Sequence, residues 1–147
     1  MKAAQAWSES QLAAAKMEHD STIQGTAGEN LFYAMSTSVD YTKTFDTAAT
    51  QAWYDEIKDY DFAKPAFGPT TGHFTQVVWK ASTKIGCGHA ADATSNVYVT
   101  CRYSPAGNMQ DAFADNVLAL TDASAGGAGA APAKAELQSG SGSSPAR

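Results

Sequence analysis

The pattern of hydrophobic and polar positions predicts two helices in the first half of the chain. Residues 3–16 are rich in Ala, Gln, Glu and Leu, which are good helix formers. A second helix is predicted from about Phe45 to Lys58, with Thr44 as its N-cap. Between them, residues 29–35 are predicted to form a short helix or turn.

The second half of the chain has the pattern of strands. Segments 73–80, 85–91 and 97–103 are rich in β-branched and aromatic residues, which favour a pleated, half-buried surface. The polar residues 92–96 are predicted to form the loop of a hairpin. Helices followed by an antiparallel meander indicate an α+β fold in which the helices cover the sheet.

The hairpin carries the two cysteines of the chain, Cys87 and Cys101, at equal distances from the loop centre at Thr94. Directly opposed residues in such a hairpin have Cβ atoms within about 5 Å, so a disulfide is feasible. Two packed free thiols are the alternative. Two cysteines are too few for a disulfide-stapled scaffold, and their spacing is not that of a zinc knuckle or a redox motif.

Composition divides the chain near Leu120. Residues 1–120 have the composition of one folded domain, and 147 residues suffice for a real core. Residues 121–147 are mostly Ala, Gly, Ser and Pro and are predicted to be a disordered tail. The chain begins inside a predicted helix without the apolar region of a signal peptide, so an incomplete N-terminus is expected.

Charge and hydropathy exclude several classes of partner. The formal net charge is −5 and there is no basic stripe, so nucleic acid is not an expected partner. Charge would not draw the domain to an anionic membrane surface either. No apolar run approaches the roughly 20 residues that a membrane span requires.

Four residues are candidates for chemistry. Glu56 follows Trp53 at helical spacing on the apolar face of the second predicted helix, so it needs either a partner or a position at the rim. His73 begins a predicted strand, where it could ligate a metal, carry a proton or hydrogen-bond within a core. Glu29 suits the first turn of a helix. His19 in its polar loop, like His89 in mid-strand, is expected to be exposed when considered alone.

Four segments resemble motifs of the CAP superfamily of cysteine-rich secretory, antigen five and pathogenesis-related proteins, both in their residues and in their order and spacing along the chain. The chain is similar to its short, cysteine-poor, Golgi-associated branch, and the resemblance covers about residues 3–117. The segments are Gly28-Glu29-Asn30-Leu31, Ala52-Trp53-Tyr54-Asp55-Glu56-Ile57, Gly72-His73-Phe74-Thr75-Gln76-Val77-Val78-Trp79, and Val99-Thr100-Cys101-Arg102-Tyr103-Ser104-Pro105-Ala106-Gly107-Asn108.

The resemblance implies a three-layer α–β–α sandwich with a cleft lined by His19, Glu29, Glu56 and His73. It implies the histidines as ligands of Zn²⁺ or another divalent metal, with the glutamates in or just beyond the first coordination shell. A metal-free network of hydrogen bonds is the alternative, and no organic cofactor is expected. The first helix of the family, with its His-Asn-x-x-Arg motif, is missing, so apolar surface should be exposed on the sheet.

The resemblance favours a non-enzymatic binding module for a sterol, a fatty acid or another lipid, or for a membrane surface or a protein partner. Phe62 and Phe67, in the loop from Tyr60 to Phe67, could contact a lipid or belong to the core. A metal-dependent, peptidase-like hydrolase is one alternative, and a structural module that self-associates as a homodimer is another. The expected location is extracellular, and the cytoplasmic face of the Golgi membrane is the alternative.

Overall fold

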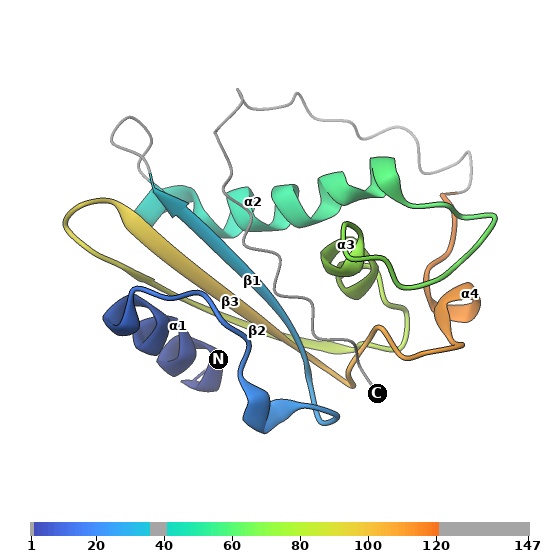
Figure 1. The fold of residues 1–147 in the computed structure, drawn as a ribbon, viewed down its shortest axis with the longest axis horizontal. Coiled ribbons are helices and arrows are strands. Elements are labelled where there is room, and N and C mark those ends of the chain that lie inside the picture. The colour runs from blue at the N-terminus through green and yellow to red at the C-terminus, as the bar shows by residue number, and fades with distance from the viewer. Residues whose placement is uncertain (1, 36–40, 121–147) are drawn as a thin grey trace.

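The computed structural model describes residues 2–35 and 41–120, so the predicted tail at 121–147 lies outside the described residues. A three-stranded antiparallel sheet forms the middle layer, with strand order β1-β3-β2 (Figure 1). The strands are β1 (Gly28–Met35), β2 (Lys84–Ala91) and β3 (Asn96–Ser104). The helices are α1 (Lys2–Ala14), α2 (Tyr41–Tyr54), α3 (Gly72–Val77) and α4 (Phe113–Asn116), with 3₁₀ turns η1 (Ser21–Ile23) and η2 (Asp55–Asp59).

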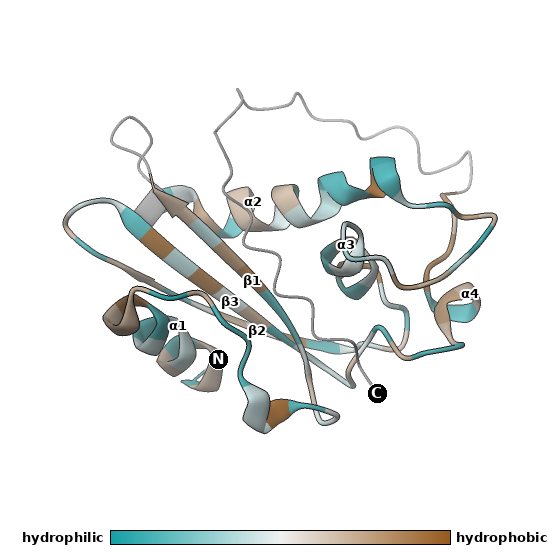
Figure 2. Ribbon diagram, viewed as in Figure 1, coloured by the Kyte–Doolittle hydropathy of each residue, from teal (hydrophilic) through white to brown (hydrophobic). Residues whose placement is uncertain are grey.

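Helices cover the two faces of the sheet, as expected for an α–β–α sandwich. Alternate residues of β3 point to opposite faces. The core cluster between the sheet and α2 contains Trp53 of α2 and three residues of β3, namely Val97, Val99 and Cys101. Figure 2 shows hydrophobic positions along both β1 and β3. Thr100 points the other way and contacts α1. The sheet therefore separates an apolar layer on the α2 side from a more polar one on the α1 side.

The contact between α1 and the sheet is made by buried polar groups and a close backbone approach. Ser8 Oγ donates to Gly88 O and lies within hydrogen-bond distance of Thr100 Oγ1, to which Gln11 Nε2 donates, each contact being 3.0 Å long. The two side chains of α1 are buried. A Cβ at Gly88 would lie 2.3 Å from Gln5 Cα, so only glycine allows the helix to pack this closely.

The strand predicted at 73–80 is wrong, because Gly72–Val77 forms the helix α3. The side chain of Glu56 accepts hydrogen bonds from the first free backbone N–H groups of this helix, at His73 and Phe74. These donors would otherwise be unsatisfied. A cap supplied 17 residues away thus overrides a local composition that favours a strand.

The helix or turn predicted at 29–35 is also wrong, since these residues form the edge strand β1. All eight residues of β1 pair with β3, from Gly28 opposite Tyr103 to Met35 opposite Asn96. The strand lies between helical layers on both faces, so Leu31 and Phe32 are both buried and no alternation marks it in the sequence.

The second predicted helix is shifted. Helix α2 begins at Tyr41 and ends at Tyr54, so Thr44 lies inside it and is not its N-cap. Glu56 belongs to the following turn, η2, and not to the helix itself. The strands predicted at 85–91 and 97–103 are confirmed as β2 and β3.

The hairpin between β2 and β3 has the predicted register, with Cys87 opposite Cys101, and the two are joined by a disulfide. Cys101 is buried, whereas Cys87 is exposed. Ile85, two residues earlier on β2, is 63% exposed. No helix in the described part of the chain has the length and apolar character needed to cross a membrane.

Replacing both cysteines by alanine should lower the free energy of unfolding by about 3 kcal/mol, because the disulfide closes a loop of about 15 residues in the unfolded chain. Urea unfolding followed by tryptophan fluorescence measures this loss. Wild-type protein unfolded in dithiothreitol is the control and should show a similar loss. A change below about 0.5 kcal/mol in both would contradict the prediction.

Candidate functional site

The first half of the candidate site joins the loop after α1 to the start of β1. His19 Nδ1 lies 3.0 Å from Glu29 Oε1, and the backbone N–H of Asp20 donates to the same oxygen. The Glu29 side chain is 4% exposed, whereas that of His19 is 32% exposed. The Glu29 carboxylate is therefore buried and held in place, whereas the His19 imidazole is partly exposed at the surface.

The second half joins η2 to the first turn of α3. His73 Nδ1 lies 2.8 Å from Glu56 Oε1, while Glu56 Oε2 accepts from the backbone N–H groups of His73 and Phe74. The His73 ring also lies nearly parallel to the Trp53 indole, with ring centroids 6.2 Å apart. One carboxylate thus caps the helix and orients the imidazole that the helix carries.

Neighbouring residues of β1 connect the two halves. Glu29 contacts His19, and the next residue, Asn30, points to the other face of the sheet and donates from Nδ2 to His73 O at 3.1 Å. Asn30 Nδ2 also lies 3.4 Å from the hydroxyl of Tyr103, where burial raises the pKa of the phenol to about 12. Strand β1 therefore fixes one histidine on each side of itself.

Three further residues support the site and were missed from the sequence. Arg102 donates to Glu29 Oε2 and to Asp20 Oδ2. Desolvation raises the pKa of Asp20, but hydrogen bonds from Thr22 and Arg102, with the charge of Arg102, outweigh it and the net pKa is lowered. Asn108 donates to Gly72 O at the start of α3. Their partners lie far away in the sequence, so no local signal pointed to them.

The carboxylates decide where each imidazole carries its proton. An ionised carboxylate only accepts hydrogen bonds, so Nδ1 of each ring is the donor and the neutral ring keeps its lone pair on Nε2. Neither Nε2 atom has a hydrogen-bond partner among the described residues. Each ring therefore presents a potential metal-ligating nitrogen away from its glutamate.

Within residues 2–35 and 41–120, no group of three or more His, Cys, Asp or Glu side chains is placed to hold a metal ion. Three protein donors already occupy the oxygens of each glutamate. The donor set thus forms no closed site of four protein ligands within these residues, and an ion bound at an imidazole here would need water for its remaining positions. Each glutamate instead orients its imidazole through the contact to Nδ1.

Two surface hollows are formed by the described residues. One runs along α2, beside Asp46 and Tyr54, and another of about 230 Å³ lies between α1 and β2, beside Lys84 and Arg102. Arg102, which contacts Glu29, therefore also lines the second of these hollows.

The fold is that of a known family. Residues 1–103 match the model of the cysteine-rich secretory protein (CAP) family. The chain belongs to this family.

Two curated relatives show how far the similarity extends. Golgi-associated plant pathogenesis-related protein 1 of Homo sapiens is 39% identical over 118 residues, which cover 78% of this chain and 73% of that protein. Protein PRY2 of Saccharomyces cerevisiae is 41% identical over 97 residues, which cover 65% of this chain but 27% of the yeast protein. The chain thus corresponds to most of the human protein and to about a quarter of the yeast one.

Solved structures agree on the fold. NaASP2, determined with Zn²⁺, has a TM-score of 0.56 and 27% identity, over 73% of this chain and 59% of that chain. BmVAL-1 has a TM-score of 0.54 and 27% identity, over 74% of this chain and 57% of that chain. This chain therefore spans less than two thirds of either of these structures.

Proposed function

We propose that this domain is a non-catalytic module that binds a lipid, such as a sterol or fatty acid, on an apolar surface beside a divalent-metal site at His19 and His73. The observation that carries the lipid part is the exposure of Phe67, which is 40% accessible in the loop after η2. Its ring lies against Gly72, immediately before His73, since a Cβ at Gly72 would be 2.9 Å from that ring.

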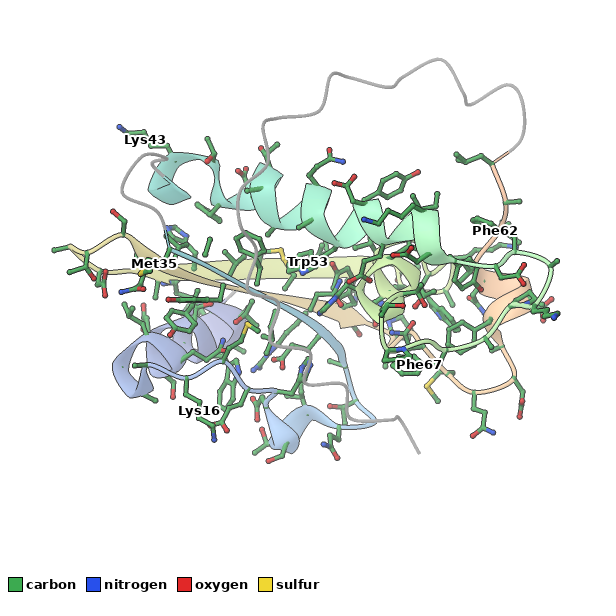
Figure 3. All side chains as sticks on the ribbon, turned by 45° about the horizontal axis from the view of Figure 1, so that its top comes forward. Lys16, Met35, Lys43, Trp53, Phe62 and Phe67 are labelled. Carbon is green, nitrogen blue, oxygen red and sulfur yellow. A yellow bond between two sulfur atoms is a disulfide. The ribbon has the colours of Figure 1, made fainter. Side chains whose placement is uncertain are left out.

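A second apolar side chain adjoins the same point. Met109 is 45% exposed and follows Asn108, whose side chain donates to Gly72 O. Phe62 differs from both, because it is half-buried against Tyr60 and Phe74 and points to another side of the loop (Figure 3). Phe62 therefore belongs to the core, whereas Phe67 is available to a ligand.

Replacing Phe67 by aspartate should weaken lipid binding about tenfold or more, because burying a phenylalanine side chain contributes about 1.5–3 kcal/mol. Binding of a fluorescent sterol and a fluorescent fatty acid to the folded domain measures the effect and separates the two lipid classes. Met35→Asp is the matched control, since Met35 is 64% exposed at the far end of β1. Equal binding by Phe67→Asp and wild type would rule out this surface.

The metal part of the proposal rests on the two free Nε2 atoms and on the chemistry of the donor set. An ion held by two imidazoles and water would be bound weakly and would supply a positive charge beside the apolar surface. The structure of the related NaASP2 with Zn²⁺ supports this choice of metal.

Hydrolytic activity is less well supported than binding. A glutamate acting as general base needs a lone pair directed at a metal-bound water. Glu29 and Glu56 instead direct their oxygens at three protein donors each, including backbone N–H groups. We therefore favour a binding role for the pairs.

We further propose an extracellular location, with the cytoplasmic face of the Golgi membrane as the alternative. The Cys87–Cys101 disulfide supports the first, because disulfides persist in oxidising compartments and are rare in the cytosol. The redox state of these cysteines in protein isolated from cells under alkylating conditions distinguishes the two locations.

A further inference from the structure

Arg102 stands out among the residues around the site, because it bridges two carboxylates and contacts neither histidine. It lies on β3 directly opposite Glu29 on β1. Its Nε donates to Glu29 Oε2 at 3.2 Å, and its Nη2 donates to Asp20 Oδ2 at 2.7 Å. The Arg102 side chain is 15% exposed, so this charge is largely withdrawn from water.

The loop that carries His19 depends on this contact. Asp20 follows His19 directly and is held by Arg102 from 82 residues away, while its backbone N–H donates to Glu29 Oε1. Asp20 Oδ1 in turn accepts from the N–H of Thr22 and caps η1. Arg102 thus fixes both the carboxylate that orients His19 and the backbone next to it.

The His73 half of the site is built without such an arginine. Glu56 is fixed by backbone N–H groups of α3, which belong to the same helix as His73. Among residues 2–35 and 41–120, Glu29 has one backbone donor, that of Asp20, and the carboxylate would gain rotational freedom if Oε2 lost Arg102 as its partner. The two halves therefore depend on different supports.

We infer that Arg102 is a positioning residue for His19. The guanidinium holds Glu29 with Oε1 at His19 Nδ1, keeps the ring proton on Nδ1 and leaves Nε2 free for a metal. It also occupies Oε2, so that Glu29 does not turn to ligate the metal itself. This inference rests on the proposed metal site, but its effect on the imidazole can be measured without metal.

The test replaces Arg102 by glutamine and compares the three histidines by NMR of protein with ¹⁵N-labelled histidine at one fixed pH. The His19 ring is expected to change from a single Nδ1–H tautomer to a mixture, whereas His73 and His89 keep their wild-type signals. Zn²⁺ affinity, measured by titration, should fall about tenfold, as for loss of other groups that orient a metal ligand. Lys84→Gln is the control, because Lys84 lines the same hollow as Arg102.

Arg102→Lys keeps the charge but cannot form the same fork to two carboxylates, so an intermediate His19 signal is expected. Changed His73 and His89 signals would reveal that Arg102→Gln is unfolded, and Arg102→Lys then serves as the folded variant for the test. An unchanged His19 tautomer in a folded Arg102 variant would overturn the inference. If wild-type protein shows no Zn²⁺ binding, the proposed metal site fails, while the NMR comparison still decides the role of Arg102.

Discussion

Replacing Glu56 by alanine is expected to lower the free energy of unfolding by about 3 kcal/mol and to weaken Zn²⁺ binding by about tenfold or more. The change removes three hydrogen bonds to a partly buried carboxylate, and bonds to charged groups contribute about 1.5–3 kcal/mol each before relaxation. Two of these three bonds are the cap of α3, and caps alone contribute about 1 kcal/mol, so relaxation leaves a total loss of about 3 kcal/mol. Urea unfolding and Zn²⁺ titration measure the two losses.

The isosteric change Glu56→Gln separates the two roles. The amide oxygen can still accept from the backbone of α3, so the loss of stability should be only about 1 kcal/mol. The amide nitrogen, however, would face His73 Nδ1 and force the ring proton to Nε2, which removes the metal-ligating lone pair. Zn²⁺ binding should therefore fall at least as far as in Glu56→Ala.

The matched control for both variants is Asp59→Ala, an exposed carboxylate of the same turn, which should change stability by less than about 0.5 kcal/mol. Wild-type Zn²⁺ affinity in Glu56→Gln would show that His73 Nε2 is not a ligand. Equal stability of Glu56→Ala and wild type would show that α3 does not depend on this cap.

Replacing Gly88 by alanine is expected to destabilise the domain by about 3 kcal/mol, the upper part of the range for overpacked cores. The new Cβ would lie 2.3 Å from Gln5 Cα and 2.4 Å from Gln5 N, and backbone atoms cannot rotate away as a side chain can. Helix α1 must therefore move off the sheet and lose the hydrogen bonds of Ser8 to Gly88 and Thr100.

Urea unfolding measures the loss for Gly88→Ala, and tryptophan fluorescence of Trp7 reports the displacement of α1. Lys84→Ala, at an exposed position of the same strand, is the control. A Gly88→Ala protein with wild-type stability would mean that α1 packs less closely than this distance indicates.

Much of the site could be recognised from the sequence because its residues lie in distinctive segments. Glu56 could be located by its spacing from Trp53 on an apolar face, although it belongs to a 3₁₀ turn and not to the helix. His19 and Glu29 could be located only by resemblance to the family, since each has an ordinary interpretation when considered alone. Arg102 could not be found, because nothing near it in the sequence reveals that its partners are residues 20 and 29.

The two wrong elements have a common cause. Local propensities differ by only about 1 kcal/mol per residue or less, so partners supplied by the fold can reverse them. At residues 72–77 a carboxylate from η2 satisfies the free N–H groups of a helix. At residues 28–35 strand β3 supplies a full ladder of hydrogen bonds.

The sequence by itself determined the hairpin with its two opposed cysteines, because this depends on residue type and local spacing. The resemblance of its motifs indicated the family and pointed to His19, Glu29, Glu56 and His73. Only the tertiary structure decided that the four residues form two separate pairs on either side of β1, that each carboxylate faces inward, and that Arg102 supports one pair alone. The physical reason is that orientation is set by hydrogen-bond donors far away in the chain, which meet their carboxylates only after the sheet has formed.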